Sequence, residues 1–337
     1  MTKHKILITG AAGFIGSHLV DLLLADGYSL KQLVLLIAPW DTLENFKKHQ
    51  GAQIVKVDIR NAKELEKQVE GCEYIFHLAA KIDFDGKSYN EYREVNVIPV
   101  LTLLLAAAKY SVKKCVFFSS IGVHGLPAGI GNILNWNENH PATYTNFYGK
   151  SKWQGEQLVE YFHQKTGLPY AIIRPASVYG PREMGPTLAL YKAIKSKQFS
   201  MIGNGRNKMH YVFVTDLVKA AYLALKSKKS SGAYIIGGPE PVQFRDIVKN
   251  IAQSIQASLL PISIPVLIAI PLSATLQFLF SLLGKKSPLY PERVRTMTTT
   301  YYYDITKART ELGYNPQVNF RKGTAITGKW YQENGYL

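Results

Sequence analysis

The sequence has few cysteines and a shortage of acidic residues, and each shortage narrows the class of protein. Only two cysteines occur in 337 residues, so a disulfide framework is excluded and both thiols are expected to be small core residues in a reducing compartment. No zinc-finger spacing and no RNA-binding aromatic signature occurs. We therefore expect neither a metal site nor a nucleic-acid partner. The 40 Lys and Arg outnumber the 24 Asp and Glu, but no basic run exceeds two residues. The net charge of +16 leaves open a phosphate-bearing ligand, an anionic membrane or no specific partner.

The chain begins with a structural element. A strand-like apolar run and the start of a glycine turn fall within the first ten residues, so no signal peptide is expected and the protein is expected to be cytoplasmic. Hydrophobic residues make up 47% of the chain and charged residues 19%, which is ordinary for a globular protein with a substantial core. Short apolar runs alternate with longer amphipathic stretches in the first half. This alternation predicts an α/β fold with a Rossmann-type, doubly wound parallel sheet.

The expected elements alternate regularly as far as residue 180. The strands are expected at Lys5–Thr9, Gln32–Ile37, Gln53–Val57, Tyr74–Leu78, Cys115–Ser119 and Tyr170–Arg174. The helices are expected at Phe14–Ala25, Thr42–His49, Ala62–Val69, Tyr89–Lys109 and Tyr148–Thr166. After residue 180 the pattern weakens, with short extended runs at Tyr211–Val214 and Tyr234–Ile236 and a helix at Ile247–Gln256. The second half is therefore expected to contain a smaller, mostly helical domain.

The motif TGAAGFIG follows the first expected strand and opens the first expected helix. Gly10 permits a tight turn, Gly13 lets the backbone approach a diphosphate, and Gly16 lets the helix pack close to the sheet. Phe14 and Ile15 begin the helix, whose free N–H groups and positive dipole end attract an anion. The motif predicts a bound dinucleotide, NAD or NADP. We accordingly assign residues 1–180 and 211–238 to an NAD(P)-binding domain, and residues 181–210 and 239–337 to a substrate-binding domain.

The motif Tyr-x-x-x-Lys occurs six times, so its context has to select one copy. Tyr148 stands in YGKSK, where an expected helix begins after a long polar loop. Ser120 ends an expected buried strand, and parallel sheets of this type hold ligands at the carboxyl ends of their strands. The i,i+4 spacing places Tyr148 and Lys152 on one helix face. An ammonium lowers the pKa of a nearby tyrosine, which can then exchange a proton with an alcohol while Ser120 donates to the developing oxyanion. These three residues are the predicted catalytic group.

Four segments occur in the order typical of the extended short-chain dehydrogenase/reductases, the NAD-dependent epimerase/dehydratase superfamily. They are TGAAGFIG, the strand end at Ser119 and Ser120, YGKSK and RPASVYGPRE. The chain resembles this family almost throughout, as far as DITKARTELGYNP. The resemblance implies further cofactor contacts: Asp58 and Ile59 at the adenine, Leu78, Ala79 and Ala80 beneath the nicotinamide ribose, Tyr148 and Lys152 beside that ribose, and Pro175 and Val178 at the carboxamide.

The choice between NAD and NADP stays open at the end of the second expected strand. Family members usually carry an acidic residue there for the 2′-hydroxyl of NAD, or an Arg for the 2′-phosphate of NADP. This chain has Ile37–Pro39, which contains neither. Asp41 lies just beyond, and Lys47 and Lys48 could reach back only if the loop folds over.

Two subgroups of the family compete for the substrate. Sugar-nucleotide epimerases and dehydratases usually hold a diphosphate with an Arg at the position of Met209. The 3β-hydroxysteroid dehydrogenase-like subgroup is more similar in an apolar segment, a PERVR helix and a Tyr-rich stretch, which here are Ser258–Gly284, Pro291–Arg295 and Tyr301–Asp304. We therefore expect an oxidoreductase that interconverts a hydroxyl and a ketone on a bulky apolar substrate, sterol-like or long-chain. A nucleotide-sugar epimerase or dehydratase is the alternative, and a non-catalytic NAD(P) sensor is a lesser one.

No charged residue occurs between Asn250 and Gly284. Within this stretch, the segment Ser258–Gly284 is long enough to span a bilayer, for which ~20 apolar residues suffice. Its prolines, at 261, 265 and 271, are expected to break it into short helices that cover the substrate pocket and expose an apolar patch. Basic residues flank the tract and favour anionic headgroups: Lys285, Lys286, Arg293 and Arg295. Peripheral contact with the inner face of a membrane and a homodimer are left open.

Overall fold

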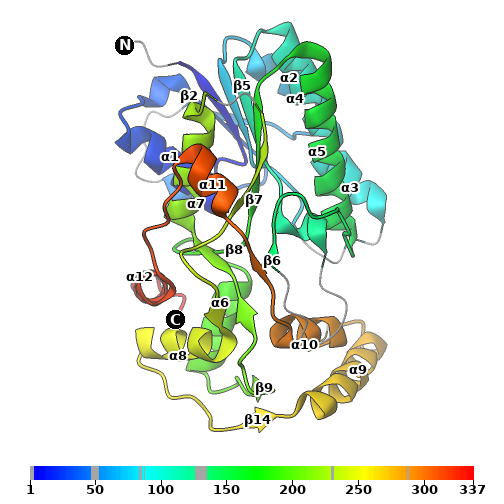
Figure 1. Cartoon of the computed structure of the whole chain (residues 1–337), viewed down its shortest axis with the longest axis vertical. Coiled ribbons are helices and arrows are strands. Elements are labelled where there is room, and N and C mark those ends of the chain that lie inside the picture. The colour runs from blue at the N-terminus through cyan, green and yellow to red at the C-terminus, as the bar shows by residue number, and fades with distance from the viewer. Residues whose placement is uncertain are drawn as a thin grey trace.

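The computed structural model describes residues 4–46, 53–82, 86, 88–125, 135–228, 231–285, 287 and 289–337. These residues form two lobes, one above the other in Figure 1. The upper lobe is built on a seven-stranded parallel sheet with the order β12-β7-β5-β4-β1-β2-β3. Its strands are β1 Ile6–Thr9, β2 Leu33–Ile37, β3 Gln53–Lys56, β4 Tyr74–His77, β5 Lys114–Phe118, β7 Tyr170–Pro175 and β12 Ala233–Ile236. The expected Rossmann-type sheet is confirmed.

Helices cover both faces of this sheet because its central strands are apolar on both faces. Ile6 and Ile8 of β1 belong to the core on the side of α1 and α7, whereas Leu7 belongs to the core on the other side. The helices of the upper lobe are α1 Phe14–Ala25, α2 Ala62–Val69, α3 Tyr89–Asn96, α4 Ile98–Lys109, α5 Phe147–Thr166, α7 Val214–Lys226 and α11 Thr306–Leu312. The first turns of α2 and α5 are capped by Asn61 and Asn146, whose side chains accept backbone N–H bonds.

One long helix was expected over residues 89–109, and the structure has two. Helix α3 ends at Asn96 and α4 begins at Ile98, with Val97 between them outside ideal helical geometry. Pro99 explains the break, because its nitrogen cannot donate to the carbonyl four residues earlier and its ring crowds that carbonyl. The helix expected at Thr42–His49 is a 3-10 turn at Glu44–Phe46, and residues 47–49 lie outside the described residues.

The lower lobe combines helices with short two-stranded sheets. Its helices are α6 Pro186–Lys195, α8 Phe244–Ser254, α9 Val266–Leu282, α10 Pro291–Thr298 and α12 Phe320–Glu333. The strand pairs are β8 Ser177–Tyr179 with β11 Tyr211–Phe213, β9 Met201–Ile202 with β14 Ser263–Ile264, β10 Lys208–Met209 with β13 Val242–Gln243, and β6 Asn135–Trp136 with β15 Tyr302–Tyr303. The mostly helical second lobe agrees with the expectation.

The apolar tract differs from the expected set of short helices. It forms the single 17-residue helix α9, which begins after Pro265 and continues through Pro271. Pro265 serves as the N-cap, and Pro271 removes only one backbone donor, so the helix tolerates it. None of residues 258–284 lines the cavity of about 250 Å³ beside Val178, and their role as a cover of the substrate pocket stays a prediction. In the part of the chain that the structure describes, no helix combines the length and apolarity needed to cross a membrane.

Candidate active site

The carboxyl ends of the central strands meet at one edge of the sheet. Thr9 at the end of β1 pairs with His77 of β4, which pairs with Phe117 of β5. The segments that follow these strands are the glycine turn, the loop from Leu78 and the Ser119–Ser120 pair. The parallel register therefore gathers three of the predicted segments at one edge, which faces the lower lobe in Figure 1.

The glycine turn leaves no room for side chains. Gly10 has a φ of +68°, and a Cβ there would lie 2.8 Å from the backbone nitrogen of Ala79. A Cβ on Gly16 would lie 2.2 Å from the carbonyl oxygen of Gly10. Gly13 is the N-cap of α1 and Phe14 its first residue, so the unpaired N–H groups of the first turn, including that of Ile15, are available at this edge. These residues fit the diphosphate of a dinucleotide.

The loop after β4 lies directly against this turn. Leu78 and Ala79 donate backbone N–H bonds of 3.1 and 3.2 Å to Thr9 Oγ1. Ala80 follows these two residues. The backbone N–H of Lys81, the next residue, donates to Asn96 Oδ1 at 2.7 Å. Asn96, which was not predicted from the sequence, is buried where α3 ends.

Asn96 also reaches the helix of the predicted catalytic pair. Its Nδ2 donates to Ser151 Oγ at 2.9 Å, and the Ser151 hydroxyl donates to the carbonyl of Tyr148 at 2.7 Å. Asn96 therefore ties the loop after β4 to the first turn of α5. Asn96 precedes Val-Ile-Pro, and a proline at that place predicts a break in the helix. This pattern is the signal that could have identified Asn96.

Charged side chains lie near the ends of β2 and β3, where the adenosine part of the cofactor is expected, and their contacts could not be predicted from the sequence. Asp58 follows β3, and its Oδ2 lies 2.5 Å from Arg60 Nη2. Arg60 lowers the pKa of Asp58 mainly through this hydrogen bond. Ile59 lies between them and is half-buried. Asp41 folds back so that its Oδ2 accepts the N–H of Ala38 at 2.9 Å.

An acidic side chain therefore does stand at the end of β2, although Ile37–Pro39 contains none. Asn45 joins the same loop to the glycine turn, because its Nδ2 donates to the carbonyl of Ala12 at 2.8 Å. Lys47 and Lys48 lie outside the described residues.

Ser120 and Tyr148 lie together. A Cβ on Gly122 would lie 3.2 Å from Ser120 Oγ and 3.8 Å from the Tyr148 ring, and Ser120 Oγ accepts the N–H of Gly122 at 3.0 Å. The first turn of α5 packs tightly on the 3-10 turn after Ser120, since a Cβ on Gly149 would lie 2.5 Å from the carbonyl oxygen of Gly122. Burial raises the pKa of Tyr148 to about 12, and the nearby Ser120 hydroxyl opposes this rise.

Lys152 lies one turn further along α5 and is 3% exposed. Its Nζ donates to the carbonyl of Phe118 at 2.9 Å and lies 5.9 Å from the centre of the Tyr148 ring. Burial lowers the pKa of Lys152 to about 8, and the charge of Glu156 opposes this. The sequence analysis expected the ammonium to lower the pKa of Tyr148. In the structure, burial is the dominant influence on both groups.

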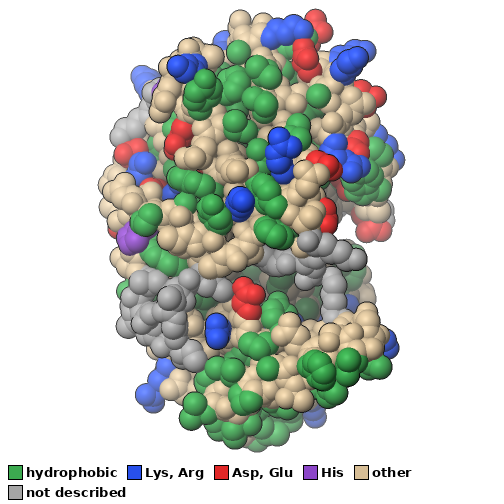
Figure 2. All heavy atoms as spheres, turned by 90° about the vertical axis from the view of Figure 1, so that its right-hand side faces the viewer, with side chains coloured by type: hydrophobic (Ala, Val, Ile, Leu, Met, Phe, Trp, Pro, Cys, Tyr) green, Lys and Arg blue, Asp and Glu red, His purple; other side chains and the backbone are tan. Residues whose placement is uncertain are grey.

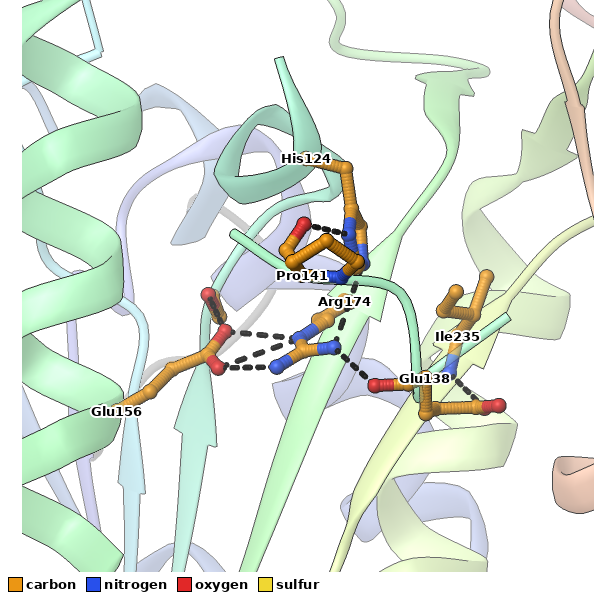
Figure 3. Close-up of polar contacts among 7 residues, drawn as sticks. His124, Glu138, Pro141, Glu156, Arg174 and Ile235 are labelled. Atoms are coloured by element: carbon orange, nitrogen blue, oxygen red, sulfur yellow. Dashed lines mark hydrogen bonds and ion pairs between the residues drawn. The ribbon is translucent and has the colours of Figure 1, made fainter. Parts of the chain in front are cut away.

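A buried ion pair joins Glu156, four residues after Lys152 on α5, to Arg174 of β7 (Figure 3). Arg174 Nη2 is 2.5 Å from Glu156 Oε2, with the side chains 4% and 0% exposed. Glu156 also accepts a hydrogen bond from Ser119, and Arg174 Nη1 lies 3.3 Å from both His124 Nε2 and the carbonyl of Glu138. The network joins α5, β7 and the segments before α5. Sequence reasoning missed Glu156, although its place four residues after Lys152 puts it on the same helix face.

The remaining predicted residues occupy the side of the site toward the lower lobe. Pro175 ends β7 beside Ile236 of β12, and Val178 of β8 pairs with Val212 of β11. Val178 also lines a cavity of about 250 Å³ with residues of α6, α8 and α12. None of Ser120, Tyr148 and Lys152 lines it, so this cavity is separate from the predicted catalytic group. Among the described residues, no cluster of His, Cys, Asp and Glu could hold a metal ion.

Comparison with known proteins places this geometry in context. The model of the NAD dependent epimerase/dehydratase family matches residues 6–237. A 3beta-hydroxysteroid-dehydrogenase/decarboxylase of Arabidopsis thaliana is 27% identical over 97% of this chain, which spans 62% of that protein. An N-acetyl-alpha-D-glucosaminyl-diphospho-ditrans,octacis-undecaprenol 4-epimerase of Escherichia coli O157:H7 is 28% identical, covering 90% of this chain and 88% of that protein. The crystal structure of UDP-glucose 4-epimerase from Thermotoga maritima, 25% identical, superposes with a TM-score of 0.77, covering 98% of this chain and 99% of that one.

Proposed function

Because the chain belongs to the NAD-dependent epimerase/dehydratase family, we propose that it oxidises a secondary hydroxyl of a diphosphate-linked sugar to a ketone with NAD, as the first half of an epimerisation or dehydration. The observation that carries the proposal is that Ser120 and Tyr148 lie side by side at Gly122, at the same sheet edge as the glycine turn. Ligands of open α/β sheets lie at this edge.

In this proposal each catalytic side chain handles the hydroxyl proton or the oxygen that carries it. When bound, oxidised nicotinamide supplies the hydride acceptor and a positive charge. Tyr148 takes the hydroxyl proton as general base, and Ser120 donates a hydrogen bond to the substrate oxygen. Lys152, held by the carbonyl of Phe118, favours the phenolate of Tyr148 through its charge.

The cofactor would lie across the upper lobe. Its diphosphate would meet the N–H groups of the α1 turn, and Asp41 would accept from the 2′-hydroxyl of NAD. The other cofactor contacts are proposed for Gly10, Gly13, Phe14, Ile15, Gly16, Asp58, Ile59, Leu78, Ala79, Ala80, Tyr148, Lys152, Pro175 and Val178. We propose that residues 1–180 and 211–238 supply the NAD site and that residues 181–210 and 239–337 supply the substrate site, except that α11 packs on the upper lobe and the β8–β11 pair lies in the lower one. The proposal places the enzyme in the cytoplasm, in peripheral contact with a membrane.

The relatives support a sugar substrate better than a sterol. Several are named as nucleotide-sugar epimerases or dehydratases, so the bulky apolar alcohol expected from the sequence becomes the second candidate. Two observations favour this second candidate. Met209, a buried apolar residue, occupies the position at which related enzymes usually carry a diphosphate-binding Arg. Helix α9 also exposes many large apolar side chains. The name of the Escherichia coli relative combines a sugar, a diphosphate and a polyprenol, so a lipid-carried sugar would suit both sets of observations.

A substrate panel tests the proposal. The protein with NAD is incubated separately with UDP-glucose, UDP-N-acetylglucosamine, dTDP-glucose and a 3β-hydroxysterol, and products are identified by NMR while reduced cofactor is followed by absorbance. Conversion of a sugar, absent in Tyr148→Phe, supports the proposal. Oxidation of the sterol alone, with stoichiometric cofactor reduction, would favour the second candidate. Cofactor binding without any turnover would leave a sensor and contradict both.

A further inference from the structure

Helix α9 presents its large apolar side chains to solvent. Leu267 is 88% exposed, Leu283 70%, Leu282 67% and Phe278 62%. With these four we define the α9 surface as also containing Leu259, Ile262, Ile268, Leu272 and Leu279, all exposed. Only Ala269 and Ser273 of the helix are buried. Val266 and Ile270 pack on the protein beside Ala269, but most large apolar side chains of the helix face outward, unlike those of an ordinary surface helix.

The α9 surface lies at the outer end of the lower lobe (Figure 1). Helix α9 is held by a small apolar cluster in which Ala269 meets Val294 of α10 and Ile202 of β9. This cluster is separate from the cores around the large sheet. Its contacts fix α9 in place while leaving its outer sides uncovered by any described residue of the chain.

Positive charge stands beside the α9 surface and is absent within it. No charged residue occurs from 251 to 283. Lys285 follows α9, and α10, packed against it, contributes Arg293 and Arg295, with Glu292 as its only acidic residue. All three basic residues are exposed. An apolar surface bordered by cations matches a bilayer with anionic headgroups, in which aliphatic side chains enter the acyl boundary and cations remain at the headgroups.

We infer that the α9 surface docks the enzyme on an anionic lipid bilayer, with α9 lying in the interface. A soluble monomer rarely leaves so large a contiguous apolar patch in water. The side of the molecule that carries α9 and α10 also shows the hollow between the two lobes (Figure 2). If the proposed function holds, docking would present this hollow to substrates carried by membrane lipids.

Vesicle flotation of the full-length protein tests the docking without any substrate. The vesicles are phosphatidylcholine alone or phosphatidylcholine mixed with phosphatidylglycerol, at low and high salt. The test variant is the double substitution Phe278→Glu/Leu282→Glu. The matched control is Leu101→Glu/Leu105→Glu, which introduces the same charges at the same spacing on the exposed face of α4 in the other lobe. Unfolding temperature and NAD affinity are measured for all proteins, so a misfolded variant or a failed cofactor site is recognised separately.

We expect the wild type to float with anionic vesicles and to bind phosphatidylcholine more weakly, and high salt to weaken binding to the anionic vesicles. The α9 double variant should lose roughly tenfold or more of its partitioning, while the α4 control partitions like the wild type. Substitution of Lys285 and Arg295 by Ala should weaken binding to anionic vesicles alone. The inference is overturned if the wild type ignores anionic vesicles, or if both double variants lose binding equally. A dimer in solution that only the α9 variant disrupts, without vesicle binding by the wild type, would assign the surface to a second copy instead.

Discussion

Replacing Lys152 with methionine should stabilise the folded protein while abolishing turnover. The ammonium of Lys152 is held inside the protein, where burial lowers its pKa to about 8. Methionine has a similar length and carries no charge, so it fills the same space without the cost of desolvation. Active-site groups commonly reduce the stability of the fold that holds them. This substitution would measure that cost at one residue.

The magnitude follows from the two pKa values. The unfolded value of 10.5 and the folded value of about 8 differ by about 2.5 units, which corresponds to about 3 kcal/mol. Below pH 8 both states are charged and the folded state carries the whole penalty. Between about pH 8 and 10.5 the unfolded state binds more protons, so wild-type stability rises with pH. The lost hydrogen bond to the carbonyl of Phe118 subtracts about 1 kcal/mol, which leaves a net gain of about 2 kcal/mol at pH 7.

Urea denaturation at pH 7 and near pH 10 measures this difference. The variant should be more stable at pH 7, and the gap should narrow at the higher pH. Lys114→Met is the matched control: Lys114 is a buried lysine at the opposite end of β5, and burial lowers its pKa too. It should raise stability at pH 7 and retain turnover. A Lys152→Met protein that is less stable at pH 7, or a gap that does not change with pH, would refute the reasoning.

Three further predictions concern the ion pair and the cofactor site. Glu156→Gln should lower the free energy of unfolding by about 3 kcal/mol, because Arg174 stays buried without its carboxylate partner. The same substitution should move the alkaline limb of the pH–rate profile to lower pH. Unchanged stability in urea denaturation would contradict the first expectation. Gly16→Ala should lower the free energy of unfolding by about 2 kcal/mol or more, because the new Cβ would meet the Gly10 carbonyl. Thermal unfolding with and without NAD measures both this loss and cofactor binding. A variant that NAD stabilises as much as the wild type would be inconsistent with the proposed contact. NAD should bind more tightly than NADP by less than about a hundredfold, or about 3 kcal/mol, and Asp41→Ser should reduce this preference. Fluorescence titration of both cofactors measures the ratio of dissociation constants. A larger ratio, or no effect of Asp41→Ser, would contradict the role of Asp41.

The sheet and the position of the predicted catalytic group could be read from the sequence because both depend on local patterns. Buried parallel strands appear as apolar runs, and the glycine turn requires three small residues at fixed places. The same reasoning located Ser120 and Tyr148 on separate elements, and the structure brings them together at Gly122. Parallel pairing brings such strand ends together whatever the length of the intervening chain.

The features that the sequence did not predict depend on contacts between distant segments. Pro271 was expected to end a helix, but α9 continues through it because the loss of one donor is tolerated. The Glu156–Arg174 pair joins a helix and a strand, and the residues around each of them do not indicate which residue is its partner. Asp41 lies beyond the end of β2 in the sequence, and only the fold of that loop returns its carboxylate to the N–H of Ala38.

The most direct test of the central claim compares two tyrosines on α5. Tyr148 and Tyr161 both begin a Tyr-x-x-x-Lys motif on this helix, but Tyr148 lies beside Ser120 at Gly122 whereas Tyr161 is 54% exposed. Single-turnover oxidation of a converted substrate is measured for Tyr148→Phe and Tyr161→Phe, together with NAD affinity. We predict that Tyr148→Phe loses at least about a thousandfold in rate, within the range for removal of a positioned acid–base group, while NAD affinity changes little, and that Tyr161→Phe behaves as the wild type. Near-wild-type turnover in Tyr148→Phe would contradict the account.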